Sequence, residues 1–279
     1  MTVTHGPAQI PAKVPAYVRA VGELRADFQR VGARTQAMNI FETGGLRLRC
    51  PKVAQGCEGV LINTGGGVAG GDRASYDFDV GAQAQVTFTT QSAEKIYRAQ
   101  FDPAQIDVAL RIGAHAAVEW LPQETILFSG ARLQRRLDME LDETSSLTML
   151  ESVIYGRMAM GETEVSGSFR DRWRIRRGRR LLFAEDMRLD GDMTGALDRP
   201  AVGDGARSNA TFLHVAPDAE QKLEAIRASL ADAPCEWGAS AWNGMALVRL
   251  ISPSPEKMRT AIVGLLQSFR GREAPRVWQ

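Results

Sequence analysis

The chain is short of the residues that most often build catalytic and metal centres. It has three cysteines and three histidines among 279 residues. The cysteines are an odd number without the spacing of a disulfide framework or a zinc site, and the histidines stand far apart in the sequence. No Gly-x-Ser-x-Gly nucleophile elbow is present. The sequence therefore offers no convincing nucleophile or general base, which favours a binding or scaffold role over an enzyme.

An excess of charge of one sign and a long hydrophobic run are also lacking. The net charge is +1, from 34 basic and 33 acidic residues, whereas a global nucleic-acid or membrane-surface binder should be more basic. The first 30 residues hold no apolar signal region, and the uncharged stretch from Gly59 to Gly71 is too short to span a bilayer. We therefore expect a cytoplasmic protein that binds neither nucleic acid nor membrane.

Hydrophobic residues recur mostly with a period of two from Val18 to about Ala210. Arg73–Val80, Ala131–Leu141 and Ser146–Tyr155 are clear examples, and Gly, Asp and Pro separate such runs at short intervals. The pattern predicts a mainly β fold with a many-stranded, β-helical or sandwich-like body. We expect a loose leader over residues 1–18 and a single domain over 19–279, in which a β-rich body (19–213) precedes a smaller α+β layer (214–279).

The last 65 residues predict two α-helices near the C-terminus. Asp218 and Gln221 fit a capping box ahead of the first helix. Ser254-Pro255 begins the second helix and Gly271 ends it. Between the helices, Asn243-Gly244 predicts the turn of a β-hairpin.

Five glycines lie within Gly65–Gly71, and Asp72 follows them. The pattern Gly-x-Gly-x-x-Gly is met literally, but a dinucleotide site needs a helix next, and Arg73–Val80 has the period of a strand. A loop between two strands fits better. The number of glycines favours a functional loop that ends in a placed carboxylate, Asp72.

Seven arginines lie within the eleven residues from Arg170 to Arg180, several of them alternating with apolar residues. On a strand this pattern puts a basic face opposite an apolar one. No aromatic residue shares the basic face, so nucleic acid is disfavoured. A solvated face or an acidic protein partner is the better interpretation.

Five strings in order carry a resemblance to a known family. They are Asn63–Asp72, Thr89–Arg98, Trp120–Ala131, Gly156–Glu162 and Pro275–Trp278. Together they resemble the urease accessory protein UreD (UreH) family over about residues 20–279. The resemblance implies a β-rich, helix-poor body with two helices near the C-terminus.

The same resemblance implies a role as a urease maturation chaperone without catalytic turnover. Proteins of this family bind the urease apoprotein and a helical partner, UreF, which recruits the nickel-carrying GTPase UreG. The resemblance implies no tightly bound cofactor, only Ni²⁺ in transit, and a water-filled passage has been proposed as its route.

Carboxylates are the ligands that suit a metal in transit, because histidine and cysteine would hold it too tightly. We hypothesise that Asp72, Glu151 and Glu185 line such a passage. Asp72 closes the glycine loop, and the two glutamates follow apolar runs, Met149-Leu150 and Leu181–Ala184. The alternative for each is a surface charge or a buried, hydrogen-bonded structural acid.

Other interpretations remain open. The C-terminal helices and the Trp278 tail either dock UreF or simply cover the sheet. A β-rich protein-binding module unrelated to urease would share the strand pattern, and an enzyme with a carboxylate pair would need two acids facing one pocket.

Overall fold

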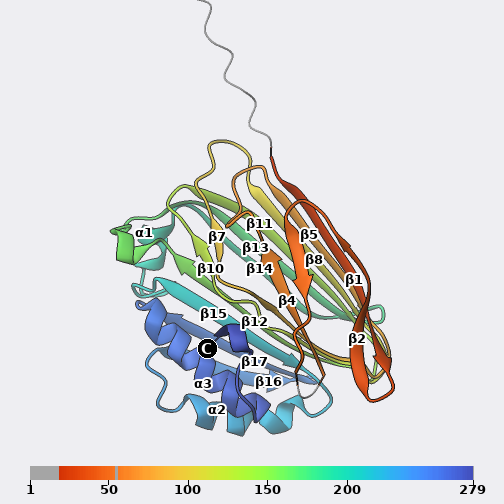
Figure 1. Cartoon of the computed structure of the whole chain (residues 1–279). Coiled ribbons are helices and arrows are strands. Elements are labelled where there is room, and N and C mark those ends of the chain that lie inside the picture. The colour runs from red at the N-terminus through yellow and green to blue at the C-terminus, as the bar shows by residue number, and fades with distance from the viewer. Residues whose placement is uncertain (1–18, 54–55, 279) are drawn as a thin grey trace, which may run out of the picture.

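The fold was analysed in a computed structural model that describes residues 19–53 and 56–278. The expected leader over residues 1–18 lies outside the described residues. Two β-sheets and a layer of two helices make up most of the described chain, and Figure 1 shows α2 (Leu223–Leu230) and α3 (Pro255–Arg270) together on one side.

Seven of the described strands form sheet A. Their spatial order is β14 (Arg180–Asp192), β13 (Ser166–Arg177), β11 (Ala131–Leu141), β8 (Ala104–Ile112), β5 (Arg73–Val80), β1 (Val21–Val31), β2 (Arg34–Glu42).

Ten of the described strands form sheet B. The main order is β16 (Glu236–Trp242), β17 (Met245–Ser252), β15 (Ser208–Val215), β12 (Ser146–Tyr155), β9 (Ala117–Trp120), β6 (Gln85–Thr90), β4 (Cys57–Asn63), β3 (Leu46–Arg49). Beside it, β10 (Thr125–Leu127) pairs with β12, and β7 (Glu94–Ile96) pairs with β10.

Between β4 and β13 the chain moves back and forth between the sheets. Strands β4, β6, β9 and β12 pair in parallel in sheet B, while β5, β8, β11 and β13 pair in parallel in sheet A. Each coil thus gives one strand to each sheet, which is a flattened β-solenoid. Antiparallel pairs flank it, such as β1–β2 and β13–β14. The expected β-helical or sandwich-like body is confirmed.

Three α-helices are described, α1 (Met193–Leu197), α2 (Leu223–Leu230) and α3 (Pro255–Arg270), with short 3₁₀ turns η1 (Met158–Met160), η2 (Ala219–Lys222) and η3 (Arg276–Trp278). Helices α2 and α3 pack on the outer face of sheet B (Figure 1). Strand β12 is therefore covered on both faces and is buried along nearly its whole length.

The predicted helix signals are confirmed for α3 and corrected for α2. Ser254 Oγ accepts from the Lys257 N–H at 3.2 Å, and Gly271 ends α3 in the left-handed region. The capping box expected at Asp218 is wrong, because its side chain makes no capping hydrogen bond and instead pairs with Lys222 Nζ at 3.3 Å. A 3₁₀ turn intervenes, and α2 begins at Leu223.

Two further features of the C-terminal layer were expected from the sequence. The hairpin β16–β17 turns at Asn243-Gly244, both with positive φ, as predicted. The Trp278 indole, however, is 3% exposed, and its Nε1–H lies 3.1 Å from the Leu121 carbonyl oxygen. This side chain fastens the chain end to sheet B, which fits the alternative that the C-terminal tail covers the sheet. Docking of UreF by the C-terminal helices and tail stays a prediction.

No helix among residues 19–53 and 56–278 is long and apolar enough to cross a membrane.

Candidate functional site

Two of the three acids singled out in the sequence, Glu151 and Glu185, face the space between the two sheets. Glu151 lies on β12 in phase with Met149 and Val153, whose side chains pack in the inter-sheet core. Glu185 lies on β14 opposite Trp173, another inter-sheet core residue. The third acid, Asp72, lies in the glycine loop and does not reach this group.

Glu151 belongs to a buried charged cluster built on Arg135 of β11. The Arg135 guanidinium donates to Asp171 of β13 in a bidentate arrangement (Nε–Oδ1 2.9 Å, Nη2–Oδ2 2.6 Å). Its Nη1 donates to Glu151 Oε2 and, at 3.1 Å, to Thr125 Oγ1. The Trp120 indole N–H donates to Glu151 Oε1 at 2.8 Å. The three charged side chains are at most 7% exposed, so their mutual hydrogen bonds replace water.

One cation faces two acids in this cluster. Burial raises the pKa of Glu151 to about 7, against the opposing effect of Arg135. Burial alone would lower the pKa of Arg135, but Asp171 and Glu151 raise it, so the guanidinium stays charged. The cluster therefore gains or loses one proton near neutral pH at Glu151.

Polar side chains continue from this cluster to the edge of sheet B. Thr211 of β15 lies opposite Glu151, and Arg249 of β17 lies opposite Thr211. Arg249 Nη1 donates to Thr211 Oγ1 at 3.3 Å, and its Nη2 pairs with Glu185 across the gap between the sheets. The Glu185 side chain is 18% exposed and that of Arg249 is 48% exposed, so the polar groups reach solvent here.

A further acid, Glu94, is partly buried on the other side of the cluster and was not predicted from the sequence. Strand β7 places Glu94 opposite Thr125 of β10, the residue that Arg135 contacts. The Asn63 side-chain amide donates to both Glu94 carboxylate oxygens, at 3.2 and 3.3 Å. Burial raises the pKa of Glu94 to about 7, although the Asn63 hydrogen bond opposes it. The carboxylate borders a cavity of about 80 Å³, which Tyr76 also lines.

We call these side chains the inter-sheet charged row. Its members are Glu94, Thr125, Arg135, Asp171, Glu151, Thr211, Arg249, Glu185.

A usable sequence signal existed for the missed members of the inter-sheet charged row. In Ala131–Leu141 the apolar residues fall at every second position, and Arg135 is in their phase. Asp171 is likewise in phase with Phe169 and Trp173. A charge in the apolar phase of a strand marks a buried ionic group. Glu94 gave no such signal, because β7 is only three residues long.

The glycine loop joins β4 to β5, and a strand follows it as predicted. A Cβ on Gly67 would lie 2.5 Å from the Tyr97 ring, and one on Gly70 would lie 2.4 Å from the Ala99 Cβ. Asp72 accepts from the backbone N–H groups of Ala20 and Ala69, both at 2.8 Å. The glycines therefore permit close approach of backbone and side chains, and Asp72 holds the loop closed.

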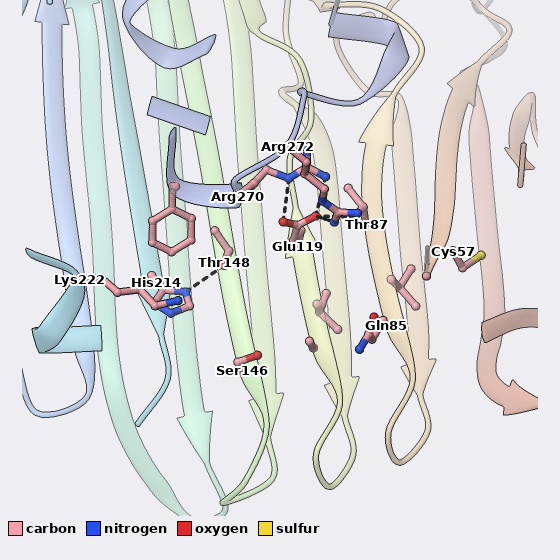
Figure 2. Close-up of a pocket in the computed structure, with 15 residues that line it drawn as sticks. Cys57, Gln85, Thr87, Glu119, Ser146, Thr148, His214, Lys222, Arg270 and Arg272 are labelled. Carbon is pink, nitrogen blue, oxygen red and sulfur yellow. Dashed lines mark hydrogen bonds and ion pairs between the residues drawn. The ribbon is translucent and has the colours of Figure 1, made fainter. Parts of the chain in front are cut away.

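A pocket of about 230 Å³ opens on the outer face of sheet B, beyond the end of α3 (Figure 2). Figure 2 shows Arg270 and Arg272 converging on Glu119 of β9. Glu119 accepts from Arg270 at 2.8 and 2.9 Å, from Arg272 at 2.9 Å and from Thr87 Oγ1 at 2.5 Å. With both carboxylate oxygens engaged, this group ties the end of α3 to sheet B.

His214 lies at the other side of the same pocket (Figure 2). Its Nδ1 is 2.9 Å from Thr148 Oγ1, and its Nε2 has no hydrogen-bond partner among the described residues. Burial, followed by the nearby Lys222 ammonium, lowers the pKa of His214 to about 4. The imidazole is therefore neutral at pH 7, and Asp218 Oδ1 lies 3.9 Å from its Nε2, beyond hydrogen-bond distance.

Across residues 19–53 and 56–278, no group of three or more His, Cys, Asp and Glu side chains is arranged to hold a metal ion. The inter-sheet charged row holds four carboxylates, and Arg135 or Arg249 pairs with three of them, those of Glu151, Asp171 and Glu185. Such groups can bind a divalent cation only weakly and only after the arginine moves aside.

Comparison with known proteins gives a consistent result. The sequence model of a family described as "UreD urease accessory protein" matches residues 20–279. A protein of Beijerinckia indica subsp. indica named "Urease accessory protein UreD" is 45% identical over 262 residues, covering 93% of this chain and 97% of that protein. A protein of the same name from Methylobacterium sp. (strain 4-46) is 46% identical over 254 residues, covering 89% and 90%.

Proposed function

The chain belongs to the UreD family of urease accessory proteins, and from that premise we propose that it is a scaffold for nickel delivery during urease maturation. In this proposal it binds the urease apoprotein and UreF, and the GTPase UreG joins through UreF. It carries out no catalytic turnover and holds Ni²⁺ only in transit, and its compartment is the cytoplasm.

The inter-sheet charged row is the observation that supports a route for nickel through the protein. It runs from the cavity beside Glu94, past Arg135 and Glu151, to Glu185 at a solvent-facing edge. A sequence of weak oxygen sites lets a cation enter and leave, as conduction requires. We propose that Glu151 and Glu185 line this route and that Asp72 lies at its glycine-loop side.

Arg135 and Arg249 act as gates in this proposal. Each guanidinium now occupies the carboxylates that a cation would need. A divalent cation brings more charge to Glu151 and Asp171 than Arg135 does, so it can compete for them if partner binding loosens the sheets. The proton that Glu151 binds near pH 7 gives a second way to empty the site.

The scaffold role is tested by assembly and activation together. The chain is co-expressed with the urease apoprotein and UreF, purified through an affinity tag, and urease activity is measured after Ni²⁺ and bicarbonate are added. A stable complex whose activation requires this chain supports the proposal. A chain that associates with neither protein contradicts it.

The second candidate, an enzyme with a carboxylate pair, is less well supported. Glu151 and Asp171 do lie close together, but Arg135 binds both and the group is sealed from solvent. An acid–base pair must reach a substrate.

A further inference from the structure

We propose that Cys50 and Cys57 form a redox-sensitive pair, which hydroperoxides oxidise to an intramolecular disulfide and thiol reductants restore. This modification site is independent of the proposed scaffold role. Cys50 directly follows β3, and Cys57 is the first residue of β4. Because β3 and β4 pair in the antiparallel direction, the two cysteines stand at the same end of the strand pair, at one edge of sheet B.

The two thiols are in contact with each other. A hydrogen bond from the Cys57 thiol lowers the pKa of Cys50, because it stabilises the Cys50 thiolate. The same hydrogen bond raises the pKa of Cys57, and burial adds to the effect. The proton of Cys50 is therefore the first to leave, and the resulting thiolate lies beside a protonated thiol.

Solvent access differs between the two thiols. Cys50 is exposed, whereas Cys57 is 8% exposed and borders the pocket on the outer face of sheet B, on the side away from His214 (Figure 2). A small oxidant in solution therefore reaches Cys50 first. An accessible thiol of lowered pKa with a second thiol beside it is the arrangement of a redox-sensitive cysteine and its resolving cysteine.

The third cysteine, Cys235, can replace neither member of the pair. It directly precedes β16, at the opposite edge of sheet B from β3. It packs against the apolar cluster beneath α2 and α3, and burial raises its pKa. The fold therefore allows one intramolecular disulfide, and Cys235 provides an internal reference for thiol reactivity.

The oxidation takes two steps and consumes one molecule of hydrogen peroxide. The Cys50 thiolate attacks one peroxide oxygen, the O–O bond breaks, and Cys50 becomes a sulfenic acid while hydroxide leaves and takes up the proton that Cys50 released. Cys57 then attacks the Cys50 sulfur. The S–S bond forms, the S–O bond breaks, and the departing hydroxide takes the Cys57 proton. Two thiols are thus oxidised to one disulfide, and the peroxide is reduced to two waters.

The negative charge of the Cys50 thiolate also opposes ionisation of Cys57. That charge disappears when Cys50 becomes a sulfenic acid, so the second step becomes easier once the first is complete. The disulfide joins the end of β3 to the start of β4. In a reducing compartment such a bond is transient, because dithiol reductants exchange with it and return both cysteines to thiols.

The test treats the reduced full chain with hydrogen peroxide, blocks the remaining thiols and digests the protein with trypsin. Trypsin cleaves after Lys52, so Cys50 and Cys57 fall in separate peptides, residues 50–52 and 53–73. We expect mass spectrometry to find these two peptides joined, and to find them separate after dithiothreitol. An oxidised chain in which the two peptides are not joined to each other overturns the proposal.

The rate of thiol loss tests the role of Cys50. In the wild type, Cys50 should lose its free thiol about tenfold faster than Cys235. In Cys50→Ser, which changes an exposed side chain, Cys57 should react about tenfold more slowly than Cys50 does in the wild type, because Cys57 is buried. Equal rates at Cys50 and Cys235 in the wild type overturn the proposal.

The variant Cys57→Ala tests the resolving step. Without a second thiol, the Cys50 sulfenic acid should persist and react with dimedone about tenfold more than in the wild type. The matched control Cys235→Ser should form the disulfide as the wild type does. Circular dichroism verifies that each variant is folded. A wild type that dimedone labels at Cys50 as strongly as Cys57→Ala contradicts a resolving role for Cys57.

Discussion

Arg135 of β11 donates to Glu151 of β12, and this contact joins the two sheets through the middle of an otherwise apolar core. Because Arg135 also holds Asp171 of its own sheet, one guanidinium balances two buried acids. Removing it leaves both without a cation.

Replacing Arg135 with Met should destabilise the fold by about 3–5 kcal/mol, because an uncompensated buried charge remains. Urea denaturation measures the loss. The matched control is Arg136→Met, one residue along the same strand but exposed, which should change stability by about 0.5 kcal/mol or less. Two variants of equal stability would show that the buried acids do not depend on Arg135.

Glu94 should make the fold lose stability as the pH rises. Its folded pKa of about 7 exceeds the ordinary value of 4.5, so the folded state binds its proton more tightly. The stabilisation, about 3 kcal/mol, is complete below about pH 4.5 and is lost as the pH rises through about 7. The variant Glu94→Gln should lack this part of the pH dependence.

Urea denaturation from pH 5 to pH 8 tests this difference for the wild type and Glu94→Gln. The variant Glu224→Gln, at an exposed position of α2, controls for the loss of one surface charge. Parallel curves for the wild type and Glu94→Gln would mean that Glu94 titrates alike in the folded and unfolded states.

Neutralising the acids of the proposed nickel route should slow urease activation without breaking the complex. We expect Glu151→Gln and Glu185→Gln to lower the nickel-dependent activation rate by about tenfold, because each removes a charged oxygen ligand. Asp72→Asn tests the glycine-loop side in the same assay. Co-purification with the apoprotein and UreF verifies assembly.

The matched control for the nickel route is Glu140→Gln, on the same strand as Arg135 but facing outward. Activation by Glu140→Gln should equal that of the wild type. If a neutralised acid leaves activation unchanged in an assembled complex, that residue has only a structural role.

The glycine loop should tolerate no side chain at Gly70. The added Cβ would lie 2.4 Å from the Ala99 Cβ and 2.7 Å from the Asp102 carbonyl oxygen, so Gly70→Ala should cost about 1–3 kcal/mol. Gly264→Ala, in the interior of α3 with open space at its Cβ, should instead stabilise by about 0.5–1 kcal/mol. Melting temperatures of the two variants should move in opposite directions.

Strand-by-strand features of the fold were predictable because they depend on local pattern. Ala131–Leu141 and Ser146–Tyr155 match β11 and β12 at both ends, and α3 begins and ends at its predicted caps. The alternation of strands between two sheets was not predictable, because period two reports which side chains are buried and not which strands are neighbours.

Only part of the inter-sheet charged row could be predicted, because the sequence pattern reports local burial and not which strands are neighbours. Glu151 and Glu185 stood out as acids beside apolar runs. Their connection through Thr211 and Arg249 depends on β12, β15 and β17 lying side by side in sheet B and on β14 lying across the gap from β17. Glu94 lies in a polar turn of the sequence, and its hydrogen bonds with Asn63 arise only in the tertiary structure.

The solenoid also bears on the order in which this chain can fold. Its parallel pairs join residues about one coil apart, such as Leu137 with Val108 and with Trp173. Synthesis from the N-terminus therefore supplies each coil after the one on which it stacks, but α3 and Trp278 emerge last. Until they do, the apolar outer face of β12 and β15 has no cover. A nascent chain stalled before residue 255 should thus recruit general chaperones that a completed chain does not.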